Sequence, residues 1–172
     1  MKKTLLSLLA LAIPALSQTT LKDSLVKHWK VTADFTLAVA NAMPAESYSY
    51  RPVPEELSFG QLMVQVAAAN LNACSLASGM PRIPIPPAAA AAAKDPNVDK
   101  AVAIQFLTDT FKFCNEAVAS MTPERMDAVV GTTRKMTGFE WLWSYFTHTA
   151  HHRGQAEVYL RMKGIVPPTY TF

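Results

Sequence analysis

Three of the four histidines in this 172-residue chain lie in the stretch HTAHHRGQ, residues 148 to 155. His148 and His152 are four residues apart, and residues with this spacing share one face of an α-helix. Two imidazoles so placed can bind one divalent metal ion, as paired histidines do in zinc-binding helices. The alternative is a histidine pair that hydrogen-bonds within the fold. His151 points about 100° away from that face, and we expect it to be exposed.

The residues around the pair predict that it faces the interior of the protein. Leu142 and Tyr145 precede His148 on the same helical face, and Tyr159 follows His152 on it. A buried imidazole needs a partner, because an unsatisfied buried polar group costs about 1–3 kcal/mol. The Glu of the metalloprotease pattern HExxH is absent here, so the pattern does not indicate a protease of that kind.

Arg153 and Gly154 follow the pair directly. Arg153 either pairs with an acidic group or lies at the surface, and the surface is the default because most arginines lie there. Glycine inside a helix costs roughly 1 kcal/mol relative to alanine. Gly154 therefore predicts the close approach of another helix or of another chain.

Four segments show the three- and four-residue periodicity of amphipathic helices, and no segment shows convincing strand alternation. Capping boxes predict where two of the helices begin, at Ser58 with Gln61 and at Thr137 with Glu140. Gly79 is a natural end for the second helix. The four segments are residues 20–43, 58–79, 98–121 and 137–164.

The second and third segments are joined by residues 80–96, MPRIPIPPAAAAAAKDP. Five prolines favour an extended path, and six alanines allow a short helix that would be marginal in isolation. A connector of this length predicts a crossover and not a tight hairpin. The sequence therefore predicts an all-α fold, a four-helix bundle with one long crossover connection.

The first 17 residues are typical of a secretory signal peptide, with a basic start, an apolar run and small residues before Gln18. An uncleaved anchor or a first helix is the alternative. Cleavage would leave one bundle domain, residues 18–172, with no stable membrane span, in the periplasm or secreted. Cys74 and Cys114 then either form a disulfide or stay as buried free thiols. The formal charge of +3, without a basic block, argues against nucleic acid as a partner.

Two stretches carry a resemblance to a known family. HTAHHRGQAEVYLRMKGIVPP resembles the C-terminal signature of the DinB/YfiT-like superfamily, His-x3-His-Arg-Gly-Gln followed by Tyr-Leu-Arg, Gly and Pro. MPAESYSYRPVPEELSFGQLM is similar to the family's segment between helices one and two. The resemblance implies a four-helix bundle, often a homodimer, with a divalent metal held by three histidines. One histidine comes from the second helix and two from the last.

His148 and His152 match the last-helix pair, but the position of the second-helix histidine holds Gln65. An amide oxygen is a weaker, neutral ligand for zinc or nickel, which favour imidazole. Gln65 therefore either completes a weakened metal site or hydrogen-bonds one of the histidines. His28 has no role implied by the resemblance, and we expect it at the surface or in the core.

Relatives of this fold include metal-dependent thiol transferases and isomerases, so the resemblance implies such an enzyme as one alternative. The altered ligand and the exported location weigh against it. The favoured reading is an exported DinB-like protein with a weakened divalent-metal site that binds an unknown small molecule or is a degenerate enzyme. A purely structural helical protein is the third possibility.

Overall fold

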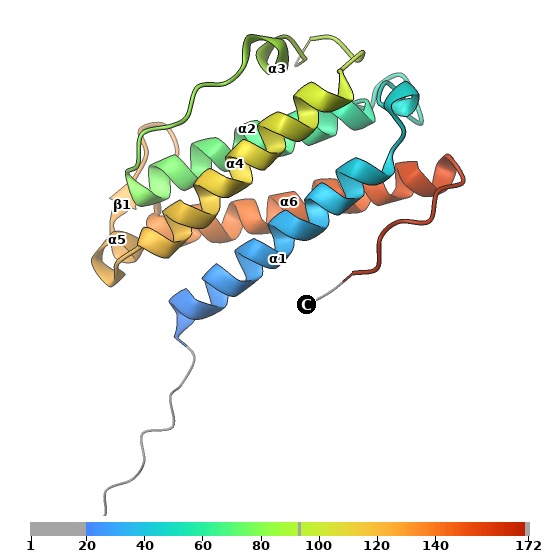
Figure 1. Ribbon diagram of the computed structural model, residues 1–172. Helices are drawn as coiled ribbons and strands as arrows, with labels where there is room; N and C mark the ends of the chain where they lie inside the picture. The colour runs from blue at the N-terminus through green and yellow to red at the C-terminus, as the bar shows by residue number, and fades with distance from the viewer. Residues whose placement is uncertain (1–19, 93, 171–172) are drawn as a thin grey trace, which may run out of the picture.

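The computed structural model describes residues 20–92 and 94–170, so the predicted signal peptide, residues 1–17, lies outside the described residues. Four long helices form a bundle (Figure 1), which confirms the predicted all-α fold. No helix in the described part of the chain is long and apolar enough to cross a membrane. The four are α1 (Leu21–Ala42), α2 (Phe59–Ser78), α4 (Lys100–Ser120) and α6 (Gly138–Met162).

Local sequence signals set the ends of these helices as predicted. Ser58 caps α2 and Thr137 caps α6, each in a complete capping box with the third residue of its helix. Both boxes satisfy amide groups that the first turn of a helix leaves without partners. At the other end of α2, Gly79 has a φ of 80°, a left-handed conformation that glycine adopts without steric cost.

The long crossover makes α2 and α4 run parallel. Near their starts, Ser58 Oγ donates to the carbonyl of Pro96 at 2.8 Å. Further along, 16 residues after Ser58 (74 − 58) and 18 after Pro96 (114 − 96), Cys74 and Cys114 form a disulfide, with their Cα atoms 5.4 Å apart. The structure thus settles the choice that the sequence left open for these two cysteines. It also confirms that the second and third long helices do not form a hairpin.

In contrast, α2 and α6 run antiparallel and lie in contact. The Tyr159 hydroxyl of α6 donates to the Leu57 carbonyl, just before α2, at 3.2 Å. Further along α2, Asn70 donates through Nδ2 to Thr149 Oγ1 at 2.8 Å. Residue numbers therefore rise along α2 as they fall along α6. This register determines which residues of the two helices can share a site.

The alanine run of the crossover forms a short helix, α3 (Pro87–Ala92). Such a segment is marginal in isolation, but here Ala89 and Ala92 are buried against the rest of the bundle. The Gln61 amide of α2 donates to the Ala92 carbonyl at 3.2 Å. Tertiary contacts therefore stabilise a helix that its own sequence would not hold.

A two-stranded antiparallel pair of strands lies between α4 and α6. The sequence did not predict it. The strands have two residues each, too few for an alternation pattern to appear. The Trp141 indole of α6 donates to the Val130 carbonyl at 3.2 Å and so ties this pair to the bundle. The minor elements are η1 (Ala45–Ser47), α5 (Pro123–Asp127), β1 (Val129–Val130) and β2 (Met136–Thr137).

Candidate metal centre between α2 and α6

The predicted histidine pair meets on one face of α6. The Nε2 atoms of His148 and His152 are 3.1 Å apart, and both side chains are partly buried. Their rings meet edge to face, with centroids 4.4 Å apart. His151 is exposed, as its helical position predicted. The two nitrogens lie within hydrogen-bond distance, so the rings form the hydrogen-bonded pair that the sequence left open as the alternative to a shared metal ion.

Gln155 holds one of these rings in place. Its Oε1 atom lies 2.7 Å from His152 Nδ1. An amide oxygen only accepts, so His152 Nδ1 is the donor of this bond, and in the neutral imidazole the lone pair is then on Nε2. Histidines that bind metals commonly donate their second ring N–H to such a partner. Gln155 thus fixes the orientation of the His152 ring.

The electrostatic setting keeps His148 neutral. Burial lowers the pKa of His148 below its ordinary value, and repulsion from His152 and then His151 lowers it further. Neutral imidazole is the form that binds metal ions. The Nδ1 atom of His148 is buried and has no hydrogen-bond partner among the described residues.

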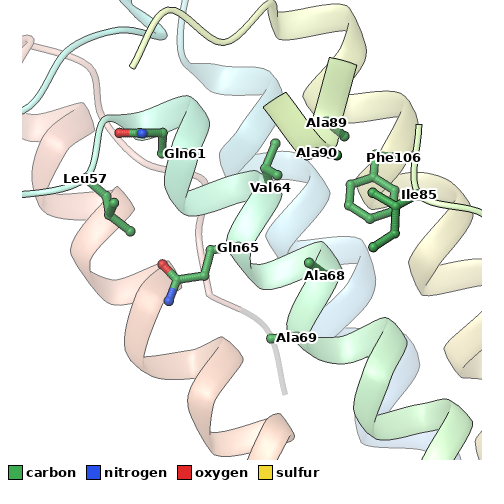
Figure 2. Close-up of a pocket in the computed structure, with 10 residues that line it drawn as sticks. All are labelled: Leu57, Gln61, Val64, Gln65, Ala68, Ala69, Ile85, Ala89, Ala90 and Phe106. Atoms are coloured by element: carbon green, nitrogen blue, oxygen red, sulfur yellow. The ribbon is translucent and has the colours of Figure 1, made fainter. Parts of the chain in front are cut away.

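Gln65 lies level with this pair. Starting from the contact between Leu57 and Tyr159, Gln65 is eight residues along α2 (65 − 57) and His152 is seven back along α6 (159 − 152). At about 1.5 Å per residue, these are rises of about 12 Å and about 10.5 Å. Figure 2 shows the Gln65 amide extending from α2 on the side where α6 runs. The register therefore brings Gln65 abreast of the histidines.

The Gln65 Oε1 atom is buried and has no hydrogen-bond partner within the described ranges. A buried acceptor without a partner costs about 1–3 kcal/mol, which indicates a missing ligand, water or ion. We call Gln65, His148, His152 and Gln155 the histidine flank. No three His, Cys, Asp or Glu side chains of the described residues gather as a metal-binding group. The histidine flank offers two imidazoles and one amide oxygen, a set that fits a divalent ion of the zinc or nickel kind weakly.

One helical turn away, a second polar contact between α2 and α6 is complete. Asn70 and Thr149 are fully buried. The Thr149 hydroxyl lies 2.8 Å from Asn70 Nδ2, 3.2 Å from Asn70 Oδ1 and 2.8 Å from the Tyr145 carbonyl. The pair therefore joins the two helices, with each side-chain polar atom within hydrogen-bond distance of another atom. The sequence reading did not single it out.

Arg153 is buried, so the surface default was wrong, and the alternative of an acidic partner is confirmed, because Arg153 Nε lies 3.9 Å from Glu157 Oε1. Only 5% of its surface is exposed. Its guanidinium lies 4.7 Å from the centroid of the Phe35 ring and 5.5 Å from that of Tyr170. Burial lowers the pKa of Arg153, while Tyr170 and Glu157 oppose that change. The guanidinium thereby fastens the C-terminal segment to α1 and α6.

A pattern in the sequence could have revealed this burial. Arg153 lies four residues after Thr149 and three before Ala156, and both are buried. It therefore belongs to the inward stripe of α6 and not to its outer face. The aromatic partners, however, come from α1 and from the end of the chain, which local periodicity does not reveal.

Gly154 lies on the outer side of α6. A Cβ atom placed there would have no heavy atom of the described residues within 4 Å. We expected another helix or another chain to approach Gly154 closely. No described helix of this chain does so. His28 lies on α1 and is exposed, which agrees with the first of its two expected places, the surface or the core.

Comparisons with known proteins agree with this architecture. The family model of the DinB superfamily matches residues 28–156. A DinB-like protein from Bacillus cereus ATCC 10987 superposes with a TM-score of 0.70 at 17% identity, covering 89% of this chain and 99% of that one. A DinB-like protein from Bacillus subtilis gives a TM-score of 0.66 at 22% identity, covering 86% and 98%. At these identities, the likeness shows the fold. No curated protein matches the chain.

Proposed function

Because the chain belongs to the DinB superfamily, we propose that it is an exported bundle with a weakened divalent-metal site that binds a small molecule. His148 and His152 are the principal ligands, and Gln65 supplies an amide oxygen. The observation that carries the proposal is the 3.1 Å approach of the two Nε2 atoms on one face of α6. The partnerless Oε1 atom of Gln65 supports it.

A zinc or nickel ion bound here would act as a Lewis acid toward an oxygen or sulfur atom of the small molecule. The protein's own contribution is orientation. Gln155 holds the His152 ring through Nδ1, and burial keeps His148 neutral. An amide in place of a third imidazole weakens the hold on the ion, which is why we place binding ahead of thiol transfer.

The disulfide supports the proposed export. Disulfides persist in oxidising compartments such as the periplasm and the extracellular space, and are rare in the cytosol. Cys74 and Cys114 form such a bond in the buried core. We therefore propose a periplasmic or secreted protein. The open space around Gly154 supports a second copy of the chain as the partner that packs on α6.

The proposal is tested by measuring metal content. Mature protein purified without chelator should contain substoichiometric zinc or nickel, and Gln65→His should raise the occupancy toward one ion per chain. The His148→Ala and His152→Ala variants should lose the ion. Gln105→His is the matched control, because Gln105 is exposed on α4 and adds a histidine far from the flank.

Elemental analysis by mass spectrometry provides the readout, and circular dichroism confirms that each variant is folded. Equal metal content in wild type, Gln65→His and Gln105→His would show that Gln65 is not a ligand position. Metal that survives both histidine substitutions would overturn the site itself.

A further inference from the structure

A cavity of about 650 Å³ lies beside the histidine flank, between α2 and the crossover segment. Figure 2 shows its lining, with Gln65 at one end and Phe106, Ile85 and the start of α3 at the other. Cavities of about 300–1,000 Å³ are typical of small-molecule sites. We call this space the crossover cavity.

Small side chains on both walls create the space. Ala68 and Ala69 of α2 face Ala89 and Ala90 of α3, and none of these side chains is long enough to fill the gap. The wall formed by the crossover is held at a fixed distance from α2. Ser58 Oγ donates to the Pro96 carbonyl, and Gln61 donates to that of Ala92. The cavity is therefore built into the fold and does not depend on a flexible loop.

The chemistry of the lining limits what can bind. Among the residues that the structure describes, no charged side chain lines the cavity, and most of its walls are alanine, valine, isoleucine, leucine and phenylalanine side chains. A charged ligand would lose its hydration here without gaining a counter-ion. The lining therefore favours an uncharged molecule that is largely apolar.

Two amides supply the polar part of the lining, and only one is engaged. The Gln61 amide accepts from the Ser58 N–H at 3.0 Å and donates to the Ala92 carbonyl at 3.2 Å. Gln65 Oε1 is buried with no described hydrogen-bond partner. It needs a donor, so the end of the ligand nearest Gln65 must present an O–H or N–H group.

We propose that the crossover cavity binds an uncharged apolar molecule with one terminal hydrogen-bond donor, of the chemical class of a medium-chain primary alcohol. The apolar chain lies along Val64, Phe106 and Ile85, and the hydroxyl donates to Gln65 Oε1. The proposal deepens the proposed function by naming the class of small molecule, and it shares Gln65 with that function. The binding described here is that of the metal-free protein.

Three probes of similar length, octan-1-ol, 1-methoxyheptane and octanoate, and the shorter hexan-1-ol test the chemistry by isothermal titration calorimetry on chelator-treated mature protein. Octan-1-ol should bind, and affinity should rise about fourfold per methylene from hexan-1-ol to octan-1-ol. The methyl ether 1-methoxyheptane has no donor and should bind about three- to tenfold more weakly than octan-1-ol. Octanoate should bind more weakly than the ether. Equal affinity for alcohol and ether, or no dependence on chain length, would overturn the proposal.

Substitutions locate the probe. Ala90→Phe and Ala68→Phe place a large side chain in the cavity and should weaken octan-1-ol binding by about tenfold or more. Ala90 is exposed, so its substitution leaves the core packing in place. Ala101→Phe on the exposed side of α4 is the matched control and should bind like wild type. Gln65→Leu should remove the preference for alcohol over ether while keeping the dependence on chain length.

The same variants separate this inference from the metal proposal. Ala90→Phe should lose the alcohol yet keep the metal content of wild type. His148→Ala should lose the metal yet still bind octan-1-ol without metal present. Undiminished alcohol binding in both phenylalanine variants would place the probe elsewhere and refute the crossover cavity, whatever the metal content is.

Discussion

Two polar regions join α2 to α6, and they differ in completeness. The first, which we call the closed layer, consists of Asn70 of α2 and Thr149 of α6, together with the adjoining disulfide Cys74–Cys114, which links α2 to α4. Every side-chain polar atom of Asn70 and Thr149 has a partner. The second is the histidine flank. Five buried side-chain atoms in the described residues lack a partner, and two of them belong to Gln65 and His148.

The difference separates a region whose buried polar atoms have partners from one in which two such atoms have none among the described residues. A satisfied buried network stabilises one arrangement of helices, whereas an incomplete one costs free energy that a bound group can recover. Substitutions in the closed layer should therefore lower stability and leave binding alone. Substitutions in the histidine flank should weaken binding and leave the free energy of unfolding nearly unchanged.

Removal of the disulfide should produce the largest effect. The bond closes a loop of about 40 residues, and a crosslink of that length contributes about 3–4 kcal/mol through the entropy of the unfolded chain. The double variant Cys74→Ala, Cys114→Ala should lose about that much free energy of unfolding in urea titrations. Dithiothreitol should destabilise wild type and not the variant. A metal content that falls with the disulfide would break the separation between the two regions.

Asn70→Ala should lower the free energy of unfolding by about 2–3 kcal/mol, because it leaves Thr149 with one partner fewer and opens a small void. Asn72→Ala is the matched control, since Asn72 is only partly buried and pairs with the exposed Arg82 at 3.4 Å. Urea unfolding should show less than about 0.5 kcal/mol for that control. Equal losses in the two variants would mean that the closed layer contributes nothing special.

Gln155→Leu tests the histidine flank from its supporting side. Loss of the partner of His152 Nδ1 should weaken zinc binding about 10- to 100-fold, with little change in unfolding free energy. Competition with a fluorescent zinc chelator measures the affinity. Gln105→Leu provides the control on α4. If zinc affinity is unchanged while stability falls, Gln155 belongs with the structural residues.

Gly154→Ala should have the smallest effect, and its sign is informative. On an open helix face, alanine should stabilise the monomer by about 1 kcal/mol. If a second copy packs closely there, the added methyl group should instead weaken self-association. Thermal unfolding combined with sedimentation velocity at several concentrations distinguishes the two outcomes.

Several features were predictable from the sequence because they depend on neighbours along the chain. The capping boxes at Ser58 and Thr137 began their helices as expected, and the spacing of His148 and His152 placed them on one face. Helical periodicity and capping are local, so a few residues suffice to specify them. The length of the crossover likewise predicted that α2 and α4 would not form a hairpin.

Other features depended on contacts between distant segments, and only the tertiary structure decided them. The burial of Arg153 requires Phe35 from α1 and Tyr170 from the end of the chain. The disulfide requires the parallel register of α2 and α4. The partnerless state of Gln65 follows from which side chains α6 and the crossover bring near it. The sequence by itself determined that His148 and His152 share one helical face, whereas the packing of α2 against α6 decided which polar atoms near them are buried without a described partner.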